Sequence, residues 1–272
     1  MERLLNKLGN LLLLIKKKRP LVHSITNTVA ANPSANVLLS IGALPIMSSD
    51  VHEVSDVVQR SQALVLNTGT LSQDRIDSML AAGKAAEMKG IPVVFDPVGA
   101  GASRARGKGI FRLLEEIKVD IIRGNLSEVA FLVGEQVEIR GVEALDEGYS
   151  EAEKRELVLK VAERFSCTAC ITGQRDFISD GENVFVVDNG HPLMSRVTAM
   201  GCMLSAVIGA FASVTDNYLD AALGAVVSYG VAGELAAEAS RGPGTFFPAM
   251  YDSLYMLESN DIVLRGKIKR LK

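Results

Sequence analysis

Short apolar runs recur along the chain, and longer segments with helical periodicity lie between many of them. The runs are rich in Val, Ile and Leu and read LPIM, ALVLN, IPVVFD, VDIIRG, CTACITG and VFVVD. The periodic segments include Asp74 to Lys89, Ala105 to Lys118 and Glu151 to Phe165. Near-continuous apolar strands joined by helices are typical of a parallel sheet that helices cover on both faces. The pattern therefore predicts an α/β protein.

Both ends of the chain add helical signals. Near the N-terminus, apolar side chains at Leu4, Leu8, Leu11 and Ile15 fall at helical spacing, which predicts an amphipathic helix packed on the body. The last third, from Cys202 to Ser240, is rich in Ala and reads as almost wholly helical. These helices are expected to complete the layers around the sheet.

Nothing in the pattern divides the chain. The most polar stretch, Glu135 to Arg155, lies between apolar strands, so we interpret it as a surface insertion rather than a boundary. The basic stretch Arg265 to Lys272 is interpreted as a solvated end. Since there is no internal repeat and no low-complexity linker, we expect a single domain over residues 1–272.

Several of the expected strands end in small or polar residues. In parallel α/β sheets these carboxyl ends meet at one edge, where ligands bind. Each residue alone could merely end a strand or cap a helix. Taken together they favour a ligand site, and the set is Gly69, Asp96, Gly99, Arg123, Asn125 and Thr172.

Composition and charge limit the classes of protein to which this chain can belong. The chain is 48% hydrophobic and 22% charged, which argues against disorder. Its formal net charge of −3 gives no electrostatic basis for binding nucleic acid. The longest apolar run near the start, Leu11 to Ile15, is too short to span a bilayer and lacks the features of a secretory signal. We therefore expect a cytoplasmic protein without a membrane or nucleic-acid partner.

The cysteines do not predict a disulfide framework or a metal site. There are three of them, an odd and low count that fits a reducing compartment. Cys167 and Cys170 form a C-x-x-C pair, but no second pair provides the remaining ligands of a zinc site. Positions three apart in a strand face opposite sides of the sheet, so both thiols are expected to be structural.

Two familiar nucleotide motifs are incomplete. Gly99 and Gly101 begin like a dinucleotide fingerprint, but Arg104 stands where a third glycine is needed. The GK pair at 107–108 resembles the end of a P-loop, yet glycine follows where Ser or Thr should bind magnesium. A better phosphate site is VTAMGC at 197–202, because small residues before an apolar helix let backbone N–H groups converge at its positive end. A tight entry turn with a buried cysteine is the alternative.

These motifs resemble those of hydroxyethylthiazole kinases, within the ribokinase-like superfamily. The resemblance is carried in order and spacing by HSITNTVAAN, GALPIMSSD, LVLNTGTL, VVFDPVGAGAS, IIRGNLSEVAFLVG, the strand ending ITG, and VTAMGCMLSAVIGAF. It covers about His23 to about Pro248. It implies a three-layer α/β/α fold with a mostly parallel central sheet. It also implies ATP-dependent phosphorylation of 4-methyl-5-(2-hydroxyethyl)thiazole for thiamine diphosphate salvage.

The resemblance assigns the turn at 197–202 two tasks. Cys202 matches a catalytic cysteine that takes the proton of the substrate hydroxyl, and a helix N-terminus is expected to lower the pKa of its thiol. An inert buried thiol is the alternative. Ala199, Met200 and Gly201 are expected to offer N–H groups to the transferring phosphate. The commoner pattern is Gly-Ala-Gly-Cys, and backbone donors survive the change to alanine if φ is negative.

The resemblance also implies a metal and a nucleotide site. Asp96 and Glu128 match an acidic pair that holds Mg²⁺ near the phosphates, directly or through water. For Glu128 the alternative is a carboxylate that simply stabilises the first turn of a helix. ATP contacts are implied for Arg123, Asn125, Thr172, Gly173, Met200 and Gly201. For Arg123 a structural salt bridge is the alternative.

The thiazole pocket implied by the resemblance is completed by a neighbouring subunit of a homotrimer. Its residues in this chain are Asn27, Pro45, Met47, Gly69 and Ala199. His23 could be a ligand nearby or a structural histidine. Two other functions stay open: a ribokinase-like kinase of hydroxymethylpyrimidine or pyridoxal, which typically has Asp at position 202, and a non-catalytic thiazole or nucleotide sensor.

Overall fold

Parallel strands form the centre of the structure, a computed structural model that describes residues 1–135, 139–140, 143–144 and 149–271. One nine-stranded sheet has the order β11-β10-β9-β8-β5-β4-β3-β1-β2. Its strands are β1 (Leu21–Ile25), β2 (Leu44–Ile46), β3 (Ala63–Asn67), β4 (Val93–Asp96), β5 (Ile121–Asn125), β8 (Thr168–Thr172), β9 (Asp176–Ser179), β10 (Val184–Val187) and β11 (Ile268–Leu271). From β2 to β8 neighbouring strands run parallel, whereas β9, β10 and β11 add antiparallel strands at one side. The predicted mostly parallel sheet is confirmed.

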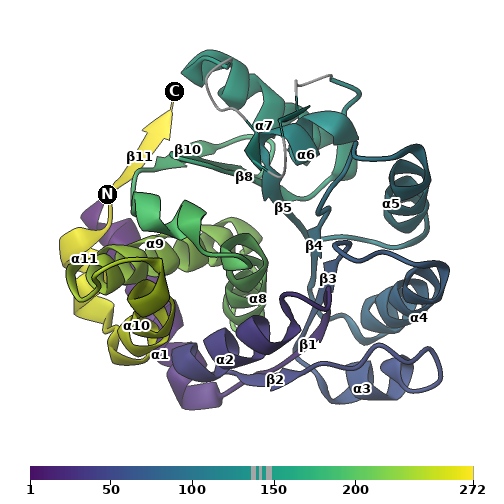
Figure 1. The fold of residues 1–272 in the computed structure, drawn as a ribbon, viewed down its shortest axis with the longest axis horizontal. Helices are drawn as coiled ribbons and strands as arrows, with labels where there is room; N and C mark the ends of the chain where they lie inside the picture. Colours follow the sequence, from purple (N-terminus) through teal and green to yellow (C-terminus); the bar gives the residue numbers. More distant parts are fainter. Residues whose placement is uncertain (136–138, 141–142, 145–148, 272) are drawn as a thin grey trace.

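Helices cover both faces of this sheet, as Figure 1 shows. They are α1 (Glu2–Lys18), α2 (Ala31–Ile41), α3 (Val54–Arg60), α4 (Gln73–Lys89), α5 (Arg104–Glu116), α6 (Leu126–Leu132), α7 (Glu151–Phe165), α8 (Met200–Ala212), α9 (Tyr218–Glu238), α10 (Pro243–Met256) and α11 (Ser259–Arg265). One apolar cluster joins one sheet face to α1, α2 and α8–α11, and a second joins the other face to α3–α7. The fold is therefore a three-layer α/β/α sandwich.

Side-chain caps fix where several helices begin. Ser72, Ser103, Asn125 and Ser150 each accept a backbone N–H from three residues ahead, which satisfies a donor that the first turn leaves free. Asn125 also ends β5, so strand and helix meet at that single residue. The turn between them is consequently tight and brings the first residues of α6 to the carboxyl edge of the sheet.

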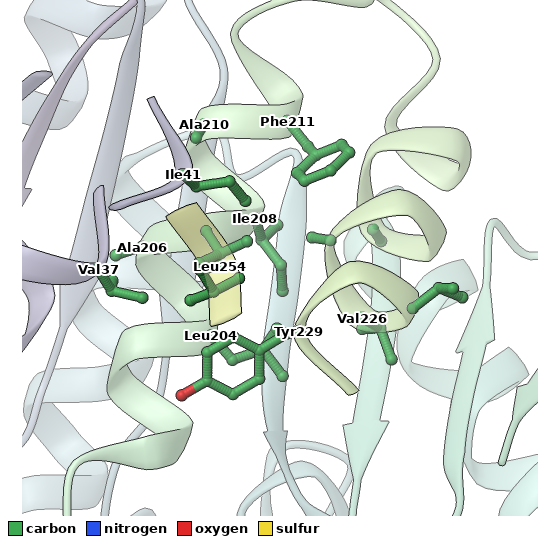
Figure 2. Packing of buried hydrophobic residues seen from close by; sticks show 14 of the residues in the cluster. Val37, Ile41, Leu204, Ala206, Ile208, Ala210, Phe211, Val226, Tyr229 and Leu254 are labelled. Carbon is green, nitrogen blue, oxygen red and sulfur yellow. The ribbon is translucent and has the colours of Figure 1, made fainter. Parts of the chain in front are cut away.

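The helical last third packs at the centre of one layer. Figure 2 shows Leu204, Ile208 and Phe211 of α8, which belong to the same apolar cluster as Val226 and Tyr229 of α9. Helix α9 is long and apolar enough to cross a membrane, but 89% of that stretch is buried inside the protein. Its apolar composition is thus explained by its place between α8 and α10.

The structure bears on three further expectations: the basic C-terminal stretch, the cysteine pair and the polar stretch before α7. The basic C-terminal stretch is not a solvated end, because Ile268–Leu271 forms β11 and pairs with β10. Cys167 and Cys170 are buried free thiols that belong to the two different apolar clusters, so the structural interpretation of that pair is confirmed. The polar stretch 135–155 lies in part outside the described residues; within it, β6 (Ile139–Arg140) pairs with β7 (Glu143–Ala144).

Candidate active site

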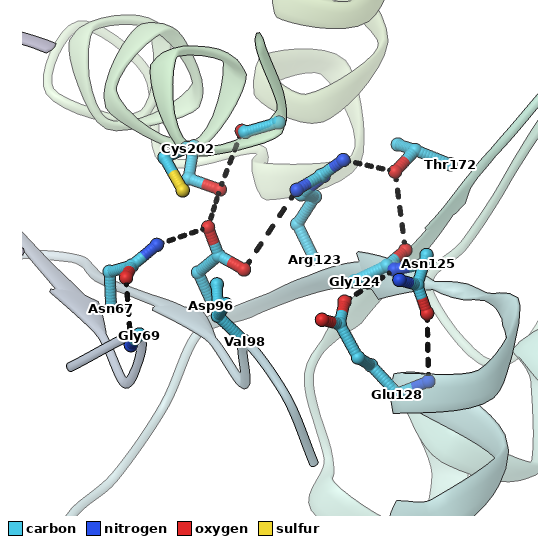
Figure 3. A network of polar contacts seen from close by, with 12 residues as sticks. Asn67, Gly69, Asp96, Val98, Arg123, Gly124, Asn125, Glu128, Thr172 and Cys202 are labelled. Carbon is cyan, nitrogen blue, oxygen red and sulfur yellow. Dashed lines mark hydrogen bonds and ion pairs between the residues drawn. The ribbon is translucent and has the colours of Figure 1, made fainter. Parts of the chain in front are cut away.

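Strand register places polar residues at the ends of neighbouring strands side by side at one edge of the sheet. Asn67 at the end of β3 is opposite Asp96 at the end of β4. Asn125 at the end of β5 is opposite Thr172 at the end of β8. Helix α8 crosses this region from the neighbouring layer, and Figure 3 shows the resulting network.

Asp96 lies at the centre of the network. It is fully buried, and its Oδ2 accepts hydrogen bonds from Asn67 Nδ2 at 2.7 Å and from Ser205 Oγ at 2.8 Å. Its Oδ1 has no hydrogen-bond partner among the described residues and lies 3.8 Å from Arg123 Nη1. Burial raises the pKa of Asp96, while Arg123, Ser205 and Asn67 act to lower it. One carboxylate oxygen thus accepts two hydrogen bonds, and the other has the ion pair with Arg123 but no hydrogen-bond donor among the described residues.

Arg123 lies between this carboxylate and the end of β8. Its side chain is buried, and Nη2 donates to Thr172 Oγ1, whose hydroxyl in turn donates to the carbonyl of Gly124 at 3.3 Å. Burial acts to lower the pKa of Arg123, but the carboxylates of Asp96 and Glu128 raise it. The structural salt bridge offered as the alternative for Arg123 is present, since Asp96 forms that ion pair, and the implied ATP contact stays a prediction.

Glu128 joins two loops of the site. Its Oε2 accepts the N–H of Asn125 and its Oε1 accepts the N–H of Gly99, both at 2.9 Å, while Asn125 Oδ1 accepts the N–H of Glu128. Burial, and then the nearby charge of Asp96, raise the pKa of Glu128. The alternative interpretation of Glu128 as a helix-start residue holds structurally, because Asn125 and Glu128 form a capping box.

The N-terminus of α8 lies against this network. The helix begins at Met200, and no side chain of the described part of the chain caps it. Its first backbone N–H groups have no partner within the helix. A Cβ on Gly201 would lie 2.6 Å from Nη1 of Arg123, so the helix start packs directly on the guanidinium. Tyr229 fixes the turn by donating its hydroxyl to the Met200 carbonyl at 2.9 Å.

Ala199 differs from the conformation we expected. Its φ is +68°, in the left-handed region, whereas survival of the donor geometry was predicted on the condition of a negative φ. That region favours glycine, since a Cβ there approaches the following carbonyl oxygen. Ala199 nevertheless leads into the helix, and its carbonyl accepts the N–H of Met203 at 2.8 Å.

The expected effect of the helix on Cys202 is wrong in this structure. The pKa of its thiol is raised to about 11, because burial and the charge of Asp96 outweigh hydrogen bonds from Asn67 and Asn27. The Asn27 amide lies 3.4 Å from Sγ. Desolvation in the first turn of α8 therefore exceeds the stabilisation of a thiolate by the helix dipole.

Asn27 and Gly69 form the other side of the site. Asn27 donates to Asn67 Oδ1 at 2.8 Å, and the N–H of Gly69 donates to the same oxygen at 3.0 Å. A Cβ on Gly69 would lie 2.5 Å from Cβ of Asn27, so only glycine fits against that side chain. Asn67 is thus bonded to Asn27, to Gly69 and to Asp96.

Pro45 and Met47 lie farther along the edge of the sheet. Pro45 is on β2, an edge strand of the sheet, and pairs with Val22; Met47 follows that strand, and both are half-buried. His23, on the adjacent β1, is buried with Nε2 at 2.9 Å from the Ser48 carbonyl, which fits a structural histidine. The structure therefore brings together Asp96, Arg123, Thr172 and Cys202 with Asn27, and places Pro45 on an edge strand of the sheet with Met47 just after it.

Three residues of the network were missing from the predicted site: Asn67, Ser205 and Tyr229. Asn67 carried a signal, because it ends an apolar strand like the residues that were chosen. Ser205 is a single hydroxyl in an apolar helix, which gives little indication that it faces a carboxylate. Tyr229 is more than twenty residues beyond the turn that it contacts, so only the packing of α9 on α8 reveals it.

The side chains fit a divalent cation only in combination with a ligand. Among the described residues there is no cluster of three or more His, Cys, Asp or Glu side chains able to hold a metal. Asp96 Oδ1 is a buried acceptor without a hydrogen-bond donor, as a metal ligand requires. Both oxygens of Glu128 already accept N–H groups, which favours contact through water. Mg²⁺ often binds through one or two carboxylates plus phosphates and waters.

Comparison with known proteins matches nearly the whole chain. A family model described as hydroxyethylthiazole kinase family matches residues 12–260. A hydroxyethylthiazole kinase of Clostridium beijerinckii is 44% identical over 97% of this chain and 98% of its own length. One of Moorella thermoacetica is 44% identical over 94% and 95%.

Solved structures agree with these matches. A hydroxyethylthiazole kinase protein from Pyrococcus horikoshii superposes with a TM-score of 0.89 at 37% identity, covering 98% of this chain and 99% of that one. A pyridoxal kinase from Staphylococcus aureus gives a TM-score of 0.66 at 13% identity, covering 93% and 99%, which shows a shared ribokinase-like fold alone.

Proposed function

The chain belongs to the hydroxyethylthiazole kinase family, and we propose that it transfers the γ-phosphoryl group of ATP to 4-methyl-5-(2-hydroxyethyl)thiazole. The acceptor is the primary hydroxyl, and the thiazole phosphate formed feeds thiamine diphosphate synthesis by salvage. One observation carries the proposal: the free Oδ1 of Asp96, the guanidinium of Arg123 and the uncapped start of α8 lie together at the carboxyl edge of the sheet.

On the phosphate side, the proposed work is positioning and charge stabilisation. Phosphoryl transfer passes through a loose transition state with charge on the equatorial oxygens, so fixed donors are more effective there than a strong base. Arg123 and the N–H groups of Met200 and Gly201 would be these donors, stabilising the negative charge on the phosphoryl oxygens. The remaining ATP contacts proposed are Asn125, Thr172 and Gly173.

Magnesium is the proposed metal, and Asp96 and Glu128 would hold it at this edge of the sheet. Asp96 Oδ1 would bind it directly, because that oxygen is buried and free of hydrogen bonds. Glu128 would act through water, because backbone N–H groups occupy both of its oxygens. When bound, the cation neutralises phosphate charge and relieves the repulsion between these carboxylates.

On the acceptor side, Asn27, Gly69 and Ala199 would border the hydroxyethyl group, with Pro45 and Met47 along the ring. Cys202 is proposed to accept the hydroxyl proton. Its contribution is small, since a thiol with a pKa of about 11 is protonated near neutral pH. Loose transfer requires proton removal only late in the reaction, which agrees with a weak base at this position.

The proposal also covers the domain organisation, oligomeric state and cellular location of the protein. We propose one kinase domain over the whole chain, working in the cytoplasm as a homotrimer whose neighbouring subunit completes the thiazole pocket. Pro45 and Met47 support this, because both are half-buried and lie on or just after edge strand β2. Val29, two residues after Asn27, exposes 59% of its surface in the isolated chain.

The test is turnover by purified protein with ATP and Mg²⁺. Thiazole, hydroxymethylpyrimidine and pyridoxal alcohols are supplied separately, and ADP and the phosphorylated product are both measured. Phosphorylation of the thiazole alcohol above the others supports the proposal. Preference for pyrimidine or pyridoxal would replace it with another ribokinase-like kinase, and saturable binding without ADP would indicate a sensor.

A further inference from the structure

Arg106 reaches from helix α5 to the backbone of two separate loops. Its Nη1 donates to the carbonyl of Thr68, to that of Gly69 at 2.6 Å and to that of Val98 at 3.1 Å. Thr68 and Gly69 follow β3, and Val98 follows β4. The stem of the side chain passes over Gly99, where a Cβ would lie 3.3 Å from Cδ and Nε of Arg106.

The first of these loops is the acceptor side of the site. Gly69 packs on Asn27 and donates its N–H to Asn67 Oδ1 at 3.0 Å. If the Gly69 peptide shifted, it would therefore displace Asn27. The amide of Asn27 lies 3.4 Å from Sγ of Cys202. The position of this loop sets where an acceptor hydroxyl can lie.

The second loop is the phosphate side. The N–H of Gly99, directly after Val98, donates to Oε1 of Glu128 at 2.9 Å. The φ of Gly99 is +71°, so the loop already uses a conformation that an L side chain rarely adopts. Thr68 links the loops further, because its hydroxyl donates to the Val98 carbonyl at 3.1 Å.

Arg106 suits the point where these carbonyls converge. A carbonyl oxygen accepts and cannot donate, and Nη1 of Arg106 offers its hydrogens to the carbonyls of Thr68, Gly69 and Val98 together. The guanidinium has five donors in a rigid plane and no acceptor. Within the described residues Arg106 forms no ion pair with a carboxylate. Its guanidinium interacts instead with the three backbone carbonyls.

We propose that Arg106 is a positioning residue that holds the acceptor-side loop and the phosphate-side loop at a fixed separation. The inference rests on the proposed kinase reaction and adds to it a residue that touches neither substrate. In-line transfer is sensitive to such spacing, since a misplacement of 1 Å can cost about 100-fold in rate. Arg106 thereby makes the geometry of the bound thiazole alcohol depend on that of the bound triphosphate.

The experiment compares the full-length proteins carrying Arg106→Ala and Arg106→Lys with wild type. We expect Arg106→Ala to lower kcat/KM for the thiazole alcohol by about 100-fold, mainly through kcat. Arg106→Lys keeps the charge and can still reach part of the carbonyl cluster, so it should recover part of the rate. The matched control is Arg104→Ala, an exposed arginine at the start of the same helix, which should keep both kcat and KM.

Thermal unfolding of each protein separates positioning from stability. Loss of rate with Tm near that of wild type, and partial rescue by lysine, supports the inference. Kinetics within two-fold of wild type in Arg106→Ala would overturn it. If Arg106→Ala does not fold, Arg106→Lys decides, and kinetics within two-fold of wild type in that variant would then overturn it. Failure of the proposed function would instead appear in the wild-type protein, as an absence of thiazole phosphate.

Discussion

Ser205 donates its hydroxyl to Oδ2 of Asp96 at 2.8 Å, from helix α8 to the end of strand β4. This hydrogen bond connects helix α8, whose first turn has no side-chain cap, with Asp96, whose Oδ1 accepts no hydrogen bond. It lies three residues beyond Cys202, one turn deeper in α8, where Ser205 is fully buried. Helix and carboxylate are thereby held in one arrangement before any ligand binds.

Ser205→Ala should slow the reaction by about 10- to 100-fold, the value of a hydrogen bond to a charged group. The hydroxyl lowers the pKa of Asp96, so its loss raises that pKa further. Because metal binding needs the ionised carboxylate, the acidic limb of the pH profile of kcat/KM should move to higher pH. Ser213→Ala, at the far end of α8, is the control. An unchanged acidic limb would contradict the role given to Asp96.

Gly201→Ala should weaken ATP binding by about 10-fold or more, the equivalent of one lost charge-assisted hydrogen bond. The added Cβ would lie 2.6 Å from Nη1 of Arg123, a guanidinium held by Thr172 and Asp96. Nucleotide titration by calorimetry measures the change. Gly244→Ala is the control, since a Cβ there meets nothing within 4 Å. Equal ATP affinity in the two variants would show that Arg123 does not bind the nucleotide.

Ala199→Gly should stabilise the fold by up to about 1.5 kcal/mol. Removing a Cβ at φ +68° relieves about 1–2 kcal/mol of left-handed strain. The added freedom of glycine in the unfolded chain offsets about 0.4–1 kcal/mol of that gain. Ala105→Gly, at an exposed site in α5 with helical backbone, should instead destabilise. Urea unfolding of both variants is the measurement, and destabilisation by Ala199→Gly would contradict the assigned backbone.

Cys202→Ala should slow turnover without abolishing it. The pKa of about 11 leaves little thiolate near neutral pH, so a base at this position supplies only part of the rate. Steady-state kinetics with ATP and the thiazole alcohol test this, alongside Tm. Complete loss of activity at an unchanged Tm would show that proton removal matters more than the structure indicates.

The same thiol can be titrated directly. The difference in ultraviolet absorbance between wild type and Cys202→Ala reports the Cys202 thiolate. This difference should rise near pH 11. Alkylation of Cys202 near neutral pH should be slower than that of an ordinary thiol, since the thiolate is the reactive species. A titration below the ordinary thiol pKa in the ligand-free protein would restore the original expectation that the helix dipole dominates.

The apolar pattern was sufficient to predict the architecture. Buried parallel strands such as Ala63–Asn67 are continuous apolar runs, and Glu151–Phe165 has the periodicity of the helix that it forms. Strands that are short, mixed in character or added antiparallel gave weaker signals. Ile268–Leu271 alternates poorly and is rich in basic residues, so its pairing with β10 followed from tertiary structure rather than from local sequence.

The site was predictable where the chain itself brings residues together. Strand ends meet at one edge by topology, which located Asp96, Arg123, Asn125 and Thr172. What the sequence did not reveal depends on side-chain packing across layers: the burial that raises the pKa of Cys202, and the hydroxyl of Ser205 that faces Asp96. Desolvation is set by neighbours distant in sequence, so a motif alone overestimated the effect of the helix dipole.

The most direct test of the account is a crystal structure with Mg²⁺, a non-hydrolysable ATP analogue and the thiazole alcohol. We predict the γ-phosphate at the first N–H groups of α8, Arg123 on the phosphates and the cation on Oδ1 of Asp96. The alcohol oxygen should lie between Asn27 and the γ-phosphate. A triphosphate bound away from Asp96 and Arg123, with that edge of the sheet left empty, would contradict the central claim.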